Sequence, residues 1–190
     1  AFLPFYHIFG LCATLLWFVF FGTTFVFLES LDAKNIQFTC KYGRVTHFFA
    51  IPTVWDMTAR QIVRTAEKQG QLETLRRAVR LSNRIQSALP HFGTWLARKV
   101  LFKKVRAQAL GTELMYCISG GGFIRPETLE LMNGLGYGLR NGYGMTETGI
   151  LSVELSRRAK IRNSGTVGKP LSAVGGGGYR ISPEGLLEVR

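Results

Sequence analysis

Two glycine-bearing segments carry residue types that could bind a ligand. The segment NGYGMTETG, from Asn141 to Gly149, combines an aromatic ring, hydroxyl groups and one carboxylate. The segment SGGGF at 119–123 exposes consecutive backbone N–H and C=O groups, because glycine has no side chain to cover them. Each follows a run typical of a strand, ELMYCIS at 113–119 and YGLRN at 137–141. Ligands bind outside the carboxyl ends of the strands in open α/β sheets, so both segments are candidate binding loops.

The second half of NGYGMTETG is predicted to begin a helix at Thr146. At such a position the helix amides and dipole favour a phosphate, and a threonine hydroxyl can donate to it. The carboxylate of Glu147 would be repelled by a phosphate unless a hard cation such as Mg²⁺ bridged the two groups. Tyr143 offers an aromatic face for a planar base. An equally weighted alternative is that Thr146 only caps the helix and Glu147 stabilises its first turn.

The N-terminal segment raises the question of a membrane span. The stretch 8–28 contains no charged residue and is long enough for a transmembrane helix. Gly22 interrupts it, however, and the aromatic and β-branched residues that follow are typical of a strand. We therefore favour a buried helix over 11–20 and a buried strand over 24–28, with an integral membrane protein as the alternative. His7 lies between aromatic residues just before this helix, where a packed histidine is the simpler interpretation.

The remaining elements alternate between helix and strand. Asp32 is a predicted N-cap, Pro126 fits a first helical turn, and Pro90 and Gly93 divide two basic helices within 72–110. Together with the predicted strands at 24–28, 113–119 and 137–141 and one ended by Pro52, this order predicts an α/β fold with a mostly parallel, doubly wound sheet flanked by helices. The last residues predict a hairpin with SPEG as its turn.

The domain organisation follows from the same reading. We expect 1–173 to form the central part of one domain, and 174–190 to form a glycine-rich connection followed by the terminal hairpin. The run Gly175–Gly178 is either a natural flexible connection or an engineered linker.

Composition narrows the class of protein. A chain of 190 residues with 46% hydrophobic residues can build a core, which excludes a disordered chain. The formal charge of +12 suits nucleic acid, a membrane surface or an anionic ligand, or else a fragment whose acidic region lies elsewhere. Cys12, Cys40 and Cys117 are widely spaced, which argues against a disulfide framework or a zinc site and favours a reducing compartment.

Four segments, taken together, resemble one family. FLPFYHIFG, YCISGGGF, NGYGMTETG and GTVGKPL occur in the order and approximate spacing of the adenylate-forming, AMP-binding enzyme superfamily. This superfamily includes acyl-CoA synthetases, luciferases and the adenylation domains of peptide synthetases. The PxxHxxG opening and the spacing of SGG to YGMTE are most similar to fatty acyl-CoA synthetases. The resemblance covers essentially the whole chain.

The resemblance implies an ATP-dependent ligase that activates a carboxylic acid, expected to be a fatty acid, as an acyl-adenylate. Coenzyme A or an acyl carrier protein would then accept the acyl group, and ATP or AMP and Mg²⁺ would be bound. In this family Tyr143 would stack on adenine, Thr146 would hold the α-phosphate, Glu147 would bind Mg²⁺ and His7 would lie near the reacting carboxylate. The implied nucleotide-binding residues are Gly120, Gly121, Gly122, Asn141, Gly142, Tyr143, Gly144 and Thr146.

The chain also departs from the family pattern. The Ser/Thr/Gly-rich phosphate loop ending in Pro-Lys-Gly, the ribose-binding aspartate and the lysine of the small C-terminal domain have no counterpart in this sequence. We therefore expect a central piece of the large domain that is inactive alone. The alternative is a non-catalytic nucleotide- or acyl-binding module of the same fold.

Two further expectations concern the surface of the basic helices at 76–106 and the location of the protein in the cell. These helices form either a solvated face or a surface for coenzyme A phosphates, an acidic carrier protein or anionic lipid. We expect a cytoplasmic protein, with a peripheral membrane contact through 76–106 as an open alternative, and no nucleic-acid partner.

Overall fold

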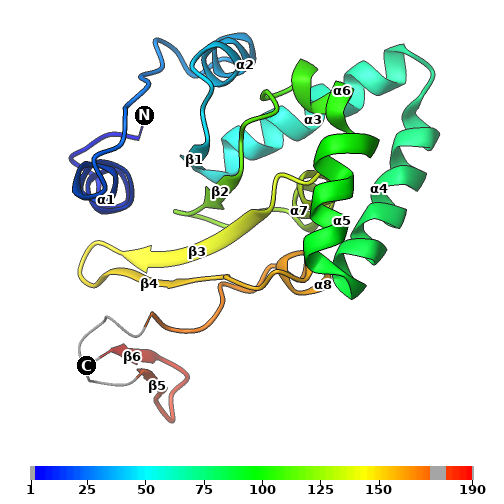
Figure 1. Ribbon diagram of the computed structural model, residues 1–190. Coiled ribbons are helices and arrows are strands. Elements are labelled where there is room, and N and C mark those ends of the chain that lie inside the picture. Colours follow the sequence, from blue (N-terminus) through cyan, green and yellow to red (C-terminus); the bar gives the residue numbers. More distant parts are fainter. Residues whose placement is uncertain (1–2, 172–178, 190) are drawn as a thin grey trace.

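The computed structural model describes residues 3–171 and 179–189 and has an α/β architecture. Four strands form one sheet in sequence order, with β1, β2 and β3 parallel and β4 antiparallel to β3. The predicted fold class, a mostly parallel sheet flanked by helices, is confirmed (Figure 1). The four strands are β1 (His47–Ala50), β2 (Tyr116–Ser119), β3 (Leu139–Met145) and β4 (Gly149–Val153). The run Gly175–Gly178 and the boundary proposed at 173 lie outside the described residues.

Two groups of helices lie at opposite ends of the molecule. Figure 1 shows α3 to α6 gathered at one end of the molecule, with η1, a π-helix, and α1 at the other. A separate antiparallel hairpin is formed by β5 (Tyr179–Ile181) and β6 (Leu187–Val189), and its turn lies at SPEG as predicted. The helices are η1 (Phe9–Leu16), α1 (Trp17–Phe20), α2 (Ala33–Tyr42), α3 (Pro52–Lys68), α4 (Leu72–Ala88), α5 (Pro90–Leu96), η2 (Ala97–Leu101), α6 (Lys103–Gln108), α7 (Pro126–Gly134) and α8 (Ala159–Arg162).

Local signals account for several helix boundaries. The Asp32 side chain accepts hydrogen bonds from the amides of Lys34 and Asn35 at 2.9 and 3.0 Å, which confirms it as the N-cap of α2. Pro126 opens α7 as predicted. Pro90 opens α5, whereas Gly93 lies inside that helix rather than between helices. An added Cβ on Gly93 would meet the backbone of α4, so glycine is what lets α4 and α5 pack closely.

The N-terminal segment differs from the prediction in two respects. The expected helix is present, but only one side of it is covered, and Phe20 is 84% exposed. The predicted strand at 24–28 is wrong, because this segment has no strand partner. Its aromatic residues instead pack by their side chains, with Phe25 next to Phe18 at a ring-centroid distance of 6.4 Å. Within the described residues, no helix is long and apolar enough to cross a membrane.

A fully buried arginine joins α6 to the segments that lead into β2 and β3. The guanidinium of Arg106 donates to the Leu114 carbonyl at 2.7 Å and lies 4.1 Å from the ring centroid of Tyr137. Burial lowers the pKa of Arg106. Arginine is not deprotonated in proteins at neutral pH, so this side chain is a buried cation. Arg98 also turns inward, donating to the Gly136 and Met115 carbonyls, so these two residues are not part of a solvated basic face.

We predict that Arg106→Ala lowers the free energy of unfolding by about 3 kcal/mol, because it leaves buried carbonyls without a donor and removes the contact with Tyr137. Urea denaturation would measure this loss. Lys104→Ala, on the exposed side of the same helix, is the matched control and should change stability by less than about 0.5 kcal/mol. Equal losses in the two variants would contradict the structural role given to Arg106.

Candidate functional site

The carboxyl ends of the three parallel strands are aligned at one edge of the sheet. Ala50 of β1 pairs with Ser119 of β2, and Ser119 pairs in turn with Asn141 of β3. The Gly120 amide donates to the Ala50 carbonyl at 3.2 Å before the turn at 120–122 leaves the sheet. Both candidate loops therefore start from the same edge, as their sequence positions predicted.

A phenylalanine from the N-terminal helix covers the glycine turn. A Cβ added to Gly120 would lie 3.0 Å from Cζ of Phe9, so only glycine lets the ring come this close. Gly121 has a φ of 81°, and Gly122 lies beside the Pro52 ring at the end of β1. Segments that are far apart in the sequence thus meet at this turn.

The segment after Asn141 continues as one arm of a hairpin. β3 runs past the parallel sheet and pairs with β4, with a bulge between Tyr143 and Gly144. A Cβ on Gly144 would collide with the carbonyl oxygen of Gly149, so the backbone of β4 can approach this closely only because Gly144 has no side chain. The Tyr143 side chain remains 37% exposed and is available for stacking.

The predicted helix at Thr146 is wrong. Thr146 and Glu147 form the turn of the β3–β4 hairpin, closed by a hydrogen bond from the Thr148 amide to the Met145 carbonyl at 3.3 Å. Gly149 follows with a φ of 72° and opens β4. The capping alternative fails for the same reason, and helix amides and dipole are not available at this position.

Thr146 and Glu147 are instead exposed at the hairpin tip. At about 3.3 Å per residue, Thr146 lies on the order of 13 Å along the strand from Gly142. The structure therefore brings Ser119 and Asn141, which precede the two glycine segments, to one edge, and the β3–β4 hairpin extends beyond that edge (Figure 1).

His7 lies at the start of the N-terminal helix. It is exposed, and its Nδ1 accepts a hydrogen bond from the Phe9 amide at 3.2 Å. A neutral imidazole that accepts at Nδ1 carries its proton on Nε2, which leaves that nitrogen as a donor. His7 is two residues before Phe9, the residue whose ring lies against Gly120.

Two buried polar atoms lie at the same edge; sequence reasoning named Asn141 as a binding residue but missed Ser119. Ser119 Oγ and Asn141 Oδ1 are buried without a hydrogen-bond partner among the described residues, and their residues are paired neighbours in the sheet. The Asn141 amide nitrogen does have a partner, the Gly165 carbonyl at 3.0 Å. This bond ties the GTVGKPL segment to β3, and Leu171 continues the connection by donating to the Leu151 carbonyl. Unpaired buried polar groups are rare, which marks this edge as a place where further hydrogen bonds can form.

The charged and thiol groups limit the chemistry available to this chain. Among the described residues, no three His, Cys, Asp or Glu side chains gather as a metal site. A single exposed carboxylate, Glu147, fits the way Mg²⁺ is usually held, by one or two carboxylates, water and substrate phosphates. Burial raises the pKa of the Cys40 and Cys117 thiols to about 12, so both stay protonated and unreactive at neutral pH.

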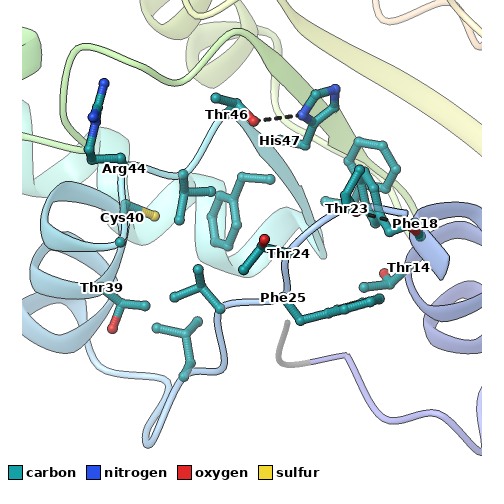
Figure 2. A pocket seen from close by; sticks show the side chains of 16 residues that line it. Thr14, Phe18, Thr23, Thr24, Phe25, Thr39, Cys40, Arg44, Thr46 and His47 are labelled. Atoms are coloured by element: carbon teal, nitrogen blue, oxygen red, sulfur yellow. Dashed lines mark hydrogen bonds between the residues drawn. The ribbon is translucent and has the colours of Figure 1, made fainter. Parts of the chain in front are cut away.

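A pocket of about 280 Å³ lies between the N-terminal helix, α2 and β1. Figure 2 shows Thr14 and Phe18 of the helix on one side and Thr39 and Cys40 of α2 on the other, with Phe25 between them. The hydroxyl of Thr14 is buried without a partner among the described residues. The π-helix that contributes Thr14 to this pocket also carries Phe9, whose ring lies against Gly120.

The comparison with family models decides the assignment. The model for AMP-binding enzymes matches residues 1–175. This chain belongs to the AMP-binding enzyme family. The structure of this AMP-binding chain is similar to the crystal structure of apo MatB from Rhodopseudomonas palustris, with a TM-score of 0.53 and 20% sequence identity. That match covers 99% of this chain and 28% of the MatB chain, and at this identity it supports the fold alone. No curated protein matches the sequence.

We predict that Gly144→Ala in this AMP-binding chain lowers the free energy of unfolding by about 1–3 kcal/mol, because the added methyl group collides with the opposite arm of the hairpin. Thermal or urea unfolding would measure the change. Gly122→Ala is the matched control, since its Cβ would lie 3.6 Å from Pro52, an ordinary contact. A Gly144→Ala variant as stable as the control would show that the hairpin arms are not closely paired.

Proposed function

We propose that this chain forms one wall of the active site in an ATP-dependent ligase that activates a carboxylic acid as an acyl-adenylate and transfers it to a thiol. The observation that carries the proposal is the alignment of Ala50, Ser119 and Asn141, which starts both glycine loops at one sheet edge. The family match supports the same activity. We assign the chain, over 1–173, to the central part of the large domain of a longer enzyme.

The nucleotide is proposed to lie along this edge and the β3–β4 hairpin. The half-exposed ring of Tyr143 would stack on adenine, and the open backbone at Gly120, Gly121 and Gly122 would border the base. The buried Asn141 and the small residues Gly142 and Gly144 would let the nucleotide approach the strand. The Asn141 Oδ1 atom has free capacity to accept a hydrogen bond.

The hairpin tip is proposed to face the phosphates. The Thr146 hydroxyl would donate to the α-phosphate, and the Glu147 carboxylate would hold Mg²⁺ against the phosphate oxygens. When bound, the metal would neutralise charge that develops on those oxygens. Since the tip is solvent-exposed and carries no helix dipole, its effect would depend on these two side chains.

The reaction itself needs no nucleophile from the protein. A carboxylate oxygen of the acid attacks the α-phosphorus and displaces pyrophosphate, and the thiol of coenzyme A or a carrier protein then attacks the acyl carbon and displaces AMP. This fits the protonated state of Cys40 and Cys117. The role proposed for His7 is to donate a hydrogen bond from Nε2 near the reacting carboxylate.

The acid is proposed to be a fatty acid, in keeping with the sequence resemblance to fatty acyl-CoA synthetases. The pocket beside the N-terminal helix supports this choice, because Phe18, Phe25 and Phe49 give it an apolar lining. An acid whose carboxylate lay near His7 could extend its tail along the helix toward Thr14, which lines this pocket.

We predict that Glu147→Gln and Thr146→Ala each reduce acyl-adenylate formation in the complete enzyme on the order of a hundredfold, because each removes a group that acts on phosphate charge. ATP–pyrophosphate exchange, titrated with Mg²⁺, would measure the effect. Glu127→Gln, an exposed carboxylate on α7, is the control and should leave exchange unchanged. Full activity of Glu147→Gln with unaltered Mg²⁺ dependence would exclude the metal role.

We predict that Thr14→Phe lowers kcat/KM for long-chain acids at least tenfold while short-chain acids are affected much less, because the larger ring fills the pocket. A chain-length series assayed by AMP release would measure the profile. Thr14→Val keeps the volume and removes only the hydroxyl, so it serves as the control. An unchanged chain-length profile in Thr14→Phe would place the acyl tail elsewhere.

A further inference from the structure

The outer surface of α4, α5 and η2 combines cations with large apolar side chains. We call this surface the basic–aromatic face and define it by two sets of residues. Its exposed cations are Arg77, Arg80, Arg84 and Lys99. Its exposed apolar side chains are Leu81, Leu89, Phe92 and Trp95.

The helices that carry this face lie in one layer. A Cβ on Gly134 at the end of α7 would contact Val79 of α4, and a Cβ on Gly136 would contact Ala97 of η2. α4 and η2 thus both pack on the segment that contains Gly134 and Gly136. The sides of these two helices that face away from this segment therefore lie on a common outer surface. Gly93 fixes α5 directly against α4, and Figure 1 shows α4 and α5 side by side at the periphery of the molecule.

The cations of this face are not neutralised within the chain. None of the four makes an ion pair with a described residue. The acidic residue nearest in sequence, Glu73, already pairs with Arg76 at 2.9 Å. Arg77, Arg80 and Arg84 follow one another at helical spacing, so they form a single stripe of positive charge along α4.

Aromatic side chains lie within the same face. Phe92 and Trp95 are each 53% exposed, and their rings are stacked with centroids 6.0 Å apart. Leu81 and Leu89 are more than half exposed on the flanking turns. Tryptophan with neighbouring Arg and Lys is the composition that stabilises a helix at a membrane–water interface.

We propose that the basic–aromatic face docks this protein onto membranes that contain anionic lipids. The cations would approach the lipid phosphates, while Phe92 and Trp95 would enter the headgroup region with α4 and α5 parallel to the membrane plane. This surface and its ligand are separate from the nucleotide site at the sheet edge. An acidic carrier protein would also attract the cations of this face. Charge attraction alone, however, does not explain why Phe92 and Trp95 are exposed beside them.

Vesicle co-sedimentation of the complete enzyme tests the proposal. The protein should bind vesicles of phosphatidylcholine with about 30% phosphatidylglycerol at least tenfold more tightly than pure phosphatidylcholine vesicles, and about 0.5 M NaCl should weaken this binding. The triple variant R77E/R80E/R84E should lose at least tenfold in affinity. Phe92→Ala with Trp95→Ala should also weaken binding, without changing the charge.

The matched control reverses three exposed cations on α3 instead, as R60E/R64E/K68E. Both triple variants have the same net charge, so selective loss in the α4 variant supports the face itself. Equal loss in both variants, or equal binding to the two vesicle types, overturns the proposal. Binding to an acidic acyl carrier protein but not to vesicles also overturns it. If the glutamate variant fails to fold by circular dichroism, R77Q/R80Q/R84Q replaces it and should lose at least fivefold.

Discussion

The alignment of Ala50, Ser119 and Asn141 across three parallel strands is the constraint on which the candidate site depends. Because the three residues are paired across neighbouring strands, both glycine loops leave the sheet at the same level along the strands. A shift of one residue in β2 or β3 would turn Ser119 or Asn141 to the other face of the sheet. A shift in β2 would also move Gly120 away from the Phe9 ring.

Two glycines of the candidate site matter because they have no side chain. Gly120 makes room for an aromatic ring, and Gly144 makes room for the backbone of the opposing strand. In both places a larger residue would push apart segments that must meet. The site is therefore organised by backbone approach more than by contacts between charged side chains.

The sequence predicted those parts of the fold that depend on local chemistry. The Asp32 cap, the Pro126 start of α7 and the SPEG turn are determined by residues close together in the chain, and all three were predicted correctly. The failures involve distant partners. The segment 24–28 has the composition of a strand but no neighbouring strand to pair with. The sequence around Thr146 is typical of a helix start, but the pairing of β3 with β4 makes it a hairpin turn. The meeting of Ser119 with Asn141 was hidden because it arises from register, which no local pattern specifies.

The partners of Arg106 have a consequence for how the core responds to its surroundings. Its hydrogen bonds go to backbone carbonyls, and its planar group lies over the Tyr137 ring. None of these acceptors takes up a proton in mildly acidic solution, unlike the carboxylate of an ordinary ion pair. Being buried, the contact is also poorly screened by dissolved salt. The contact between α6 and the segments before β2 and β3 should therefore persist in mildly acidic solution and at high salt. The charge interactions on the outer surface of the protein would change under the same conditions.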